Sequence, residues 1–478
     1  TMTYLSAYSF TTIYSEVYGH KTNFITLPQE RYLTIALFLT QNVDPSKRMA
    51  EAKQLFNHLR DRIISPATPV MNHANIKDHQ LSSCFIDTVE DSLNSIYDSN
   101  TDLANVSKFG GGIGVYVGKI RSRASSIRGI EGVSKGIVPW IKQLNNTAVS
   151  VDQLGQRSGA IAVYLDIWHA DLMQFLSLKL NNGDERQRAH DIFTALSIPD
   201  LFMETLEQRG DWHLFDPSEV ERVMGFRLED YYDEEDGQGS FREKYMECVA
   251  NKDLKRITIP AVQISKAYYR SQLETGTPFM FFRDEVNRMN PNKHEGIIYA
   301  SNLCTEIAQN MSETVREDKY YDELSGKIVT YHDPGDFVVC NLFSINLPKA
   351  VKLGKLKDAV KVAIRSLDNT IELNRLPVVQ AEVTNKKYRS LGLGTLGWDH
   401  LRVLEGLEWN SQEAVDYTDE LYSKIAYWAI EESSDLAAEL GSYEYFEGSE
   451  WQTGKYFERR GYFEGDRKED WEKLAEKV

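Results

Sequence analysis

The chain has 478 residues, a formal net charge of −17, 42% hydrophobic residues and 26% charged residues. This composition is typical of a folded protein with length for one large domain or two to three average ones. The acidic balance argues against nucleic acid or an anionic membrane surface as the main partner, since both require an excess of Lys and Arg. No segment is apolar enough to span a membrane, and the first residues lack the pattern of a signal peptide.

The first 64 residues are predicted to form an N-terminal helical region. Apolar residues recur there at helical spacing in two runs: Leu33, Ala36 and Leu37, followed by Ala50, Leu55, Phe56 and Leu59. From residue 65 onward, short apolar runs are separated by Gly, Asn and Asp, with helical stretches between them. Runs that are apolar throughout favour buried strands of a parallel sheet, and they occur at residues 84–86, 161–165, 279–282 and 338–340. Residues 65–478 are therefore predicted to form an α/β domain.

Two further segments carry local signals. Residues 229–237 are strongly acidic, and we interpret them as a solvated loop because no cation-ligand spacing repeats there. Near the end of the chain, Asn410 with Glu413 three residues later predicts a helix N-cap and its capping box. Gly441 predicts the end of that helix, whose apolar stripe is Leu421, Ile425, Trp428 and Ala429.

Two glycine runs have spacings that could indicate nucleotide binding. Gly392–Gly397 spells GxGxxG, but the preceding residues 385–390 are too polar for the buried first strand of a dinucleotide fold, so close packing or a tight turn is the better interpretation. Gly110–Gly114 is not followed by Lys-Ser/Thr, so it is not a P-loop; it marks close backbone approach, either as a packing device or as a pocket wall. Two loops pair Arg with Gly, a combination suited to phosphate, at residues 126–129 and 157–160.

The segment 301–307 is the richest in chemical groups. If it is extended, Asn302, Cys304 and Glu306 lie on one face, each about 7 Å from the next. A carboxylate beside a thiol disfavours the thiolate, so Cys304 suits hydrogen-atom transfer better than ordinary nucleophilic attack, and Glu306 suits a general base. The alternative is a buried structural cysteine with a surface glutamate.

The remaining cysteines are less informative on their own. Cys84 and Cys340 lie in apolar runs, where a thiol is often simply buried, and Cys248 lies in a polar helical context. Four cysteines without a CxxC spacing do not form a disulfide framework or a structural zinc site, which favours a reducing, cytoplasmic location.

In combination, these segments resemble the large catalytic subunit of class I ribonucleotide reductase. The resemblance rests on ordered blocks over nearly the whole chain, at residues 65–71, 82–84, 90–93, 110–114, 153–160, 301–307, 340–342 and 391–397. It implies a ten-stranded α/β barrel with the reactive thiol on a central loop. It also implies reduction of ribonucleoside 5′-diphosphates to 2′-deoxy products by thiyl-radical chemistry.

The resemblance assigns roles residue by residue. Cys304 would be the thiyl radical that takes the 3′-hydrogen, Glu306 the base at the 3′-hydroxyl, and Asn302 a hydrogen-bonding partner of the substrate. Cys84 and Cys340 would be the reducing dithiol that ends as a disulfide. The positions implied to touch the substrate also include Thr68, Ser83 and Gly112.

Allosteric control is implied as well. A deoxynucleotide or ATP effector would bind at the interface of a homodimer, at positions matching Asp91, Ser92, Arg121 and Arg128, near a first loop at residues 126–135. A second loop carrying Gln153 and Arg157 would relay the effector's identity to the substrate site.

The implied partners are a radical-generating, metal-containing small subunit and a thioredoxin-like or glutaredoxin-like reductant, with no metal bound by this chain. Pro66 comes too early for an N-terminal ATP cone, and the family's C-terminal elements have no match, so we expect an incomplete barrel that is inactive alone and requires a separate C-terminal piece. Two alternatives stay open: the cobalamin-dependent form of the enzyme, and an inactive nucleotide-binding fragment. Leu303 between Asn302 and Cys304 favours class I over the cobalamin form.

Overall fold

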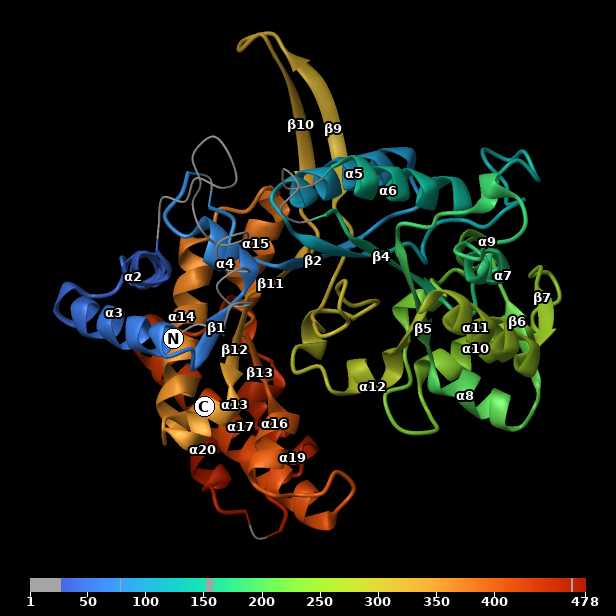
Figure 1. Ribbon diagram of the computed structural model, residues 1–478. Helices are drawn as coiled ribbons and strands as arrows, with labels where there is room; N and C mark the ends of the chain where they lie inside the picture. Colours follow the sequence, from blue (N-terminus) through green and yellow to red (C-terminus); the bar gives the residue numbers. More distant parts are fainter. Residues whose placement is uncertain (1–26, 78, 152–157, 466) are drawn as a thin grey trace. The chain divides into compact units, whose positions relative to one another are not determined.

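The computed structural model describes residues 27–77, 79–151, 158–465 and 467–478. The chain folds into two compact units, shown in Figure 1. Unit 1 comprises the described residues of Thr1–Ser83, Val339–Leu376 and Asn385–Val478, and unit 2 comprises those of Cys84–Val338 and Pro377–Thr384. Unit 2 is therefore formed by one long and one short stretch of the chain. Each unit has its own hydrophobic core.

Unit 2 is built on a parallel sheet. Its strands run in the order β2-β3-β4-β5-β8, and Val338, the first residue of β11 (Val338–Cys340), belongs to the same unit. The strand bounds are β2 Cys84–Thr88, β3 Gly112–Tyr116, β4 Ile161–Asp166, β5 Phe193–Ile198 and β8 Phe279–Phe282. β2, β3 and β4 are buried along their whole length, which explains why their sequences are apolar throughout rather than alternating.

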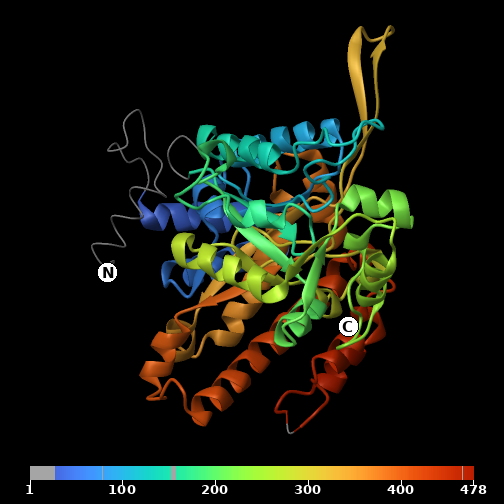
Figure 2. The ribbon, with the colours of Figure 1, turned by 90° about the vertical axis from the view of Figure 1, so that its right-hand side faces the viewer.

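Helices connect these parallel strands. α5 (Leu93–Lys108) links β2 to β3, and α6 (Val138–Ser150) links β3 to β4; the two helices pack side by side (Figures 1 and 2). The other helices of unit 2 are α7 Leu172–Leu176, α8 Asp200–Glu207, α9 Pro217–Met224, α10 Ser240–Ala250, α11 Ala261–Thr275 and α12 Arg283–Arg288. Two antiparallel pairs complete the unit: β6 (Asp211–Leu214) with β7 (Ile257–Pro260), and β9 (Val315–Asp322) with β10 (Lys327–Asp333). Both views show the β9–β10 hairpin projecting from the rest of unit 2.

Unit 1 is largely helical around a small sheet. β1 (Ile64–Pro66) pairs antiparallel with β12 (Leu342–Asn346), which pairs parallel with β13 (Gly392–Leu396). Its helices are α2 Pro28–Leu39, α3 Pro45–Arg60, α4 Thr68–His73, α13 Leu347–Lys352, α14 Leu356–Leu373, α16 Trp398–Leu404, α17 Gln412–Leu440, α18 Glu450–Thr453, α19 Lys455–Arg459 and α20 Trp471–Lys477, while α15 (Val379–Tyr388) crosses from unit 2. The core gathers α2, α3, α14 and α17 against this sheet.

Most predicted elements are confirmed. All four fully apolar runs are strands, both N-terminal apolar patterns are helices, and Gly441 follows the last residue of α17. The N-cap of α17 is Ser411, whose hydroxyl accepts from the Ala414 amide, so the prediction of Asn410 is wrong by one residue. No helix among the described residues has both the length and the apolar character needed to cross a bilayer.

The acidic segment at residues 229–237 and the expected barrel differ in outcome. The acidic segment is not simply a solvated loop, because Glu229 and Asp233 are buried, and Asp233 forms an ion pair with Arg242 at 3.2 Å. Burial raises the pKa of Glu229 to about 8. The ten-stranded closed barrel stays a prediction: within the part of the chain that the structure describes, neither unit contains a closed sheet.

Candidate active site

The register of the parallel sheet places the first candidate thiol. Cys84 is the first residue of β2, and its partner across the ladder is Gly112, the first residue of β3; two residues further along, Ile86 faces Gly114. Cys84 is only 3% exposed. The thiol is therefore fixed by a buried strand at one end of the sheet, beside a strand that begins with alternating glycines.

The glycines of β3 make room for the segment that carries Cys304. A Cβ atom at Gly114 would overlap the Ser301 carbonyl oxygen and lie 2.9 Å from the Cα of Asn302. A Cβ at Gly112 would lie 2.8 Å from a methyl carbon of Leu303 and 3.6 Å from Cys84 Sγ. The glycine run is thus both a packing device and one wall of the thiol site, because the backbone of Ser301 and Asn302 and the side chain of Leu303 lie directly against it.

The segment 301–307 is not extended, so the prediction of three side chains along one strand face is wrong. Residues 303–305 form a turn, with Thr305 in the left-handed region at φ +67°. The Asn302 side chain stabilises this turn, since its Oδ1 accepts from the backbone amides of Glu306 and Ile307, both at 3.1 Å. An alternating polar pattern over so few residues cannot separate a strand from a turn closed by an asparagine.

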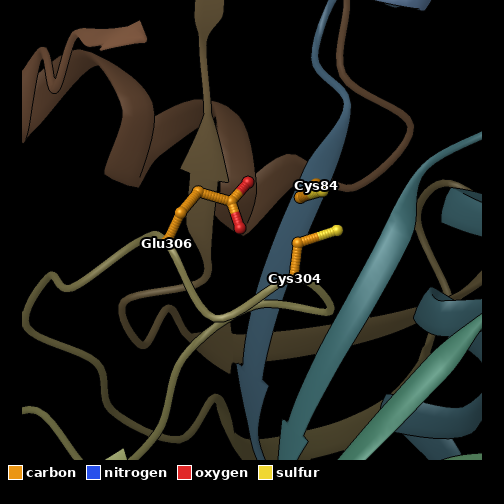
Figure 3. Close-up of side chains that lie close together, drawn as sticks. All are labelled: Cys84, Cys304 and Glu306. Atoms are coloured by element: carbon orange, nitrogen blue, oxygen red, sulfur yellow. The ribbon is translucent and has the colours of Figure 1, made fainter. Parts of the chain in front are cut away.

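The turn nevertheless brings reactive groups together. Cys84 Sγ, Cys304 Sγ and a carboxylate oxygen of Glu306 all lie within 4.8 Å of one another. Figure 3 shows the three side chains converging, Cys84 from β2 and the other two from the loop. Cys304 and Glu306 are exposed, whereas Asn302 is fully buried. Among the described residues, this is the one group of three His, Cys, Asp or Glu side chains close enough to share a metal ion.

Asn302 has spare hydrogen-bonding capacity. Its Oδ1 is occupied by the loop amides, but within the described part of the chain its buried Nδ2 has no hydrogen-bond partner. A buried donor without a partner costs roughly 1–3 kcal/mol of stability, and a ligand that accepts from it removes that cost. Asn302 is therefore both a loop-stabilising residue and a donor available to a bound molecule.

Tyr164 is a site residue that the sequence pattern did not predict. This residue lies in the buried strand β4, and its hydroxyl donates to the Asn302 carbonyl oxygen at 2.8 Å. Burial raises the pKa of Tyr164 well above its ordinary value, so the hydroxyl keeps its proton and acts as a donor. The signal that could have identified it is a single hydroxyl group in the otherwise apolar run 161–165.

Three predicted residues lie in unit 1. The Ser83 hydroxyl donates to Cys340 Sγ at 3.9 Å, and both residues are buried. Their neighbours hold them, since the Ser82 hydroxyl donates to Asn341 Oδ1 at 2.9 Å. Thr68 is the first residue of α4 and is half-buried. The structure therefore brings Ser83 and Cys340 together within this unit.

The predicted effector residues form a second, smaller group in unit 2. The Asp91 carboxylate pairs with the Arg121 guanidinium at 2.7 Å and accepts from the Arg121 amide, and Arg121 also donates to the Ser126 carbonyl. Ser92 is the N-cap of α5. Arg128 is exposed in a tight turn, at φ +51°. Burial raises the pKa of Asp91, although the charge of Arg121 acts in the opposite direction.

The two loops expected near the effector differ in whether the structure describes them. Gln153 and Arg157, expected on the second loop, lie outside the described residues. The loop expected at 126–135 is described, and it contains a bridge between Ile127 and Ile130.

Comparisons with known proteins identify the family. Residues 82–478 match the family model for the ribonucleotide reductase barrel domain, and residues 3–79 match that for the ribonucleotide reductase all-alpha domain. The chain is 46% identical over 458 residues to the ribonucleoside-diphosphate reductase subunit alpha of Treponema pallidum, covering 94% of this chain and 53% of that protein.

Two more distant relatives agree. The subunit alpha of Synechocystis sp. is 37% identical over 467 residues, covering 95% of this chain and 56% of the relative. The large subunit of Monkeypox virus is 36% identical over 433 residues, covering 88% and 51% respectively. The chain thus spans about half the length of the curated relatives it matches. The chain belongs to the family of ribonucleotide reductase large subunits.

Proposed function

We propose that the chain carries the catalytic centre for reduction of ribonucleoside 5′-diphosphates to 2′-deoxyribonucleoside diphosphates. The observation that carries this proposal is the convergence of Cys84, Cys304 and Glu306 within 4.8 Å. These groups supply three of the parts that the reaction needs: a hydrogen-atom acceptor, one thiol of the reducing dithiol and a base. Relatives named as ribonucleoside-diphosphate reductases support the substrate class.

In this proposal Cys304 is the residue that takes the 3′-hydrogen as a thiyl radical. It is exposed on a turn, so a nucleotide can reach it, and a carboxylate oxygen of Glu306 lies within 4.8 Å of its sulfur. Glu306 accepts the proton of the 3′-hydroxyl. The buried Nδ2 of Asn302 donates to the substrate, which supplies the partner it lacks among the described residues.

Cys84 and Cys340 supply the two electrons. The 2′-hydroxyl leaves as water, a hydrogen takes its place, and the two thiols become one disulfide, so atoms and electrons balance. Ser83, whose hydroxyl contacts Cys340, and Thr68 are proposed to contact the substrate. Gly112 would do so through its backbone, because it presents no side chain opposite Cys84.

Asp91, Ser92, Arg121 and Arg128 are proposed to bind a deoxynucleotide or ATP effector at a homodimer interface. The exposed Arg128 and the partly exposed Arg121 offer guanidinium groups for phosphate, and the N-terminus of α5 follows Ser92. Gln153 and Arg157 would carry the specificity signal. The radical would come from a metal-containing small subunit, and a thioredoxin-like or glutaredoxin-like protein would restore the dithiol.

The proposal also includes three features of the fold. They are a helical region at residues 1–64, a catalytic barrel domain from residue 65, and ten strands in the complete barrel. Because the chain spans about half the length of its relatives, we expect turnover only when the rest of that length is supplied.

The test is a complementation assay. The reduced chain is mixed with the segment of the Treponema pallidum relative beyond the matched region, a radical-generating small subunit, reductant and a ribonucleoside diphosphate. We expect deoxynucleotide formation that Cys304→Ser abolishes and that the chain alone does not show. Activity that needs adenosylcobalamin and no small subunit would assign the cobalamin-dependent form instead. Effector binding without any turnover would assign a nucleotide-binding protein.

The dithiol has its own test. In a Cys304→Ser variant, mild oxidation followed by non-reducing peptide mapping should give a disulfide between Cys84 and Cys340, with Cys248 reduced. Cys248 is a suitable reference because burial raises the pKa of its thiol to about 12. Absence of this disulfide would remove the proposed electron source.

A further inference from the structure

The thiol–carboxylate group has a second chemical property. Sulfur from Cys84, sulfur from Cys304 and an oxygen of Glu306 form a mutual triangle with no side longer than 4.8 Å (Figure 3). Both elements that carry these atoms belong to unit 2, so the triangle depends on a single folded unit. Two thiol ligands and one carboxylate are a donor set that zinc uses in proteins.

The spacing fits a tetrahedral cation. Zn–S bonds of about 2.3 Å and Zn–O bonds of about 2.0–2.2 Å correspond to ligand separations of roughly 3.5–3.8 Å. Since no side of the triangle exceeds 4.8 Å, no side must contract by more than about 1.3 Å. Cys304 and Glu306 lie on an exposed turn and can make this movement, whereas Cys84 is held by the sheet. Three protein ligands leave a fourth position for water.

We propose that Cys84, Cys304 and Glu306 form an inhibitory binding site for a thiophilic divalent cation, with Zn²⁺ as the best match. Binding converts both thiols to metal thiolates and releases two protons to the solvent, with no change in oxidation state. Hard cations such as Mg²⁺ and Ca²⁺ are excluded, because they require six or more oxygen ligands.

The binding of the cation goes beyond the proposed reaction and does not depend on it, whereas its inhibitory effect rests on the proposed function. A metal thiolate at Cys304 has no S–H bond, so cation binding and hydrogen-atom transfer exclude each other at the same sulfur atom.

The experiment uses Co²⁺ as a spectroscopic probe on the full reduced, chelator-treated chain, without nucleotide or partner. We expect one Co²⁺ per chain, with thiolate-to-cobalt charge-transfer absorption in the near ultraviolet, displacement by Zn²⁺ and release of two protons per metal in weak buffer. Cys304→Ser and Cys84→Ser should each weaken Co²⁺ binding at least about 100-fold, and Glu306→Gln about 10-fold.

Matched controls separate this site from general metal binding. Cys248→Ser removes a buried thiol of the same unit, and Glu317→Gln removes an exposed carboxylate on β9; both should bind Co²⁺ as the unmodified chain does. Zn²⁺ should also protect Cys84 and Cys304, but not Cys248, from alkylation followed by mass spectrometry.

Specific outcomes would overturn the inference. They are the absence of a thiolate band at millimolar Co²⁺, and a band that survives Cys304→Ser. Cys304 is exposed, so that variant remains informative even if Cys84→Ser fails to fold. Since no turnover is measured, failure of the cation site and failure of the proposed reaction are distinguishable.

Discussion

The two glycine-rich strands of the molecule are similar in sequence, but different segments of the chain pack against them. β3 in unit 2 and β13 in unit 1 each lie beside a parallel neighbour and each begin with Gly-x-Gly. In β3 the missing side chains admit the backbone of Ser301 and Asn302, which carries the reactive turn. In β13 the space at Gly392 is taken by the Asn341 carbonyl, and Gly397, directly after β13, lies against the ring of Pro348.

The difference shows what a glycine run can and cannot indicate. Both runs correctly mark close backbone approach, because a Cβ at Gly392 would lie 2.7 Å from the Asn341 oxygen. Only the identity of the approaching segment decides whether a functional site results. The literal GxGxxG of residues 392–397 follows helix α15 rather than a strand, so it lacks the context of a dinucleotide fingerprint. The run at residues 110–114 matches no fingerprint and yet lines the thiols.

The largest expected effect comes from closing the space in β3. Gly114→Ala places a methyl group on the Ser301 carbonyl and 2.9 Å from the Cα of Asn302, and backbone cannot move aside cheaply. We expect a loss of about 3 kcal/mol or more in the free energy of unfolding, measured by urea denaturation. Gly394→Ala is the matched control, because its nearest contact is the Ser344 hydroxyl at 3.1 Å; it should cost about 1 kcal/mol or less. Equal losses in the two variants would contradict the comparison.

The second effect is a pH dependence of the unfolding free energy, which we expect from the strand beside β3 and not from β13 or its neighbour β12. Asp87 on β2, beside β3, is buried, and burial raises its pKa to about 7, whereas strands β12 and β13 contain no ionisable residue. Between pH 4 and 7 the unfolded chain loses this proton while the folded chain keeps it, so the Asp87 contribution lowers stability as pH rises and levels off above pH 7.

Asp87→Asn should remove that slope. We compare the unfolding free energy of the variant with that of the unmodified chain at each pH. The difference, variant minus unmodified, should rise by roughly 2–4 kcal/mol from pH 4 to pH 8. The measurement is urea denaturation at both pH values. A difference between the two proteins that does not change with pH would show that Asp87 is ionised in the folded chain.

A smaller effect is expected at Gly112. In Gly112→Ala the new methyl group meets a methyl carbon of Leu303 at 2.8 Å, and a side chain can shift where backbone cannot. We expect a cost of about 1–2 kcal/mol and a several-fold change in the alkylation rate of Cys304. The double variant with Leu303→Ala should recover part of this loss. Without any recovery, the contact between these two positions would not be the cause.

The smallest effect is expected at Tyr164. Tyr164→Phe removes the hydroxyl that donates to the Asn302 carbonyl, and should cost about 1 kcal/mol while raising the alkylation rate of Cys304 as the turn loosens. Tyr268→Phe is the control, since its buried hydroxyl donates to the Pro278 carbonyl at 3.1 Å. The control should lose similar stability but leave Cys304 reactivity unchanged. If both variants altered Cys304 equally, Tyr164 would have no specific role in positioning the turn.

Much of the fold was predictable from local patterns. The runs at residues 84–86 and 161–165 are strands because a chain apolar on both faces is stable only inside a covered parallel sheet. The N-cap of α17 was misplaced by one residue because Asn410 and Ser411 are both good N-caps, and the sequence does not rank them. Glu229 and Asp233 were misread because residues more than 50 positions away hold them: Arg283 donates to the Glu229 carbonyl, and Asp284 accepts from the Asp233 amide.

The site was predictable only in part. Residue types at 302, 304 and 306 indicated a thiol, a carboxylate and an amide in one place, but the turn depends on Asn302 folding back on the amides of Glu306 and Ile307. The proximity of Cys84 to Cys304 bridges more than 200 positions of sequence and arises from the β2–β3 register. No local pattern contains that information. The family resemblance implied a shared site, and it gave no indication of Tyr164.

The central claim is that β3 allows Cys84 and Cys304 to meet. The most direct measurement is cross-linking by dibromobimane, which joins two neighbouring thiols, in a Cys340→Ser background, followed by peptide mapping. We predict a bridged Cys84–Cys304 peptide pair that forms in the Gly394→Ala variant and is strongly reduced in Gly114→Ala. Separate single modification of Cys84 and Cys304, with no bridged pair, would contradict the account.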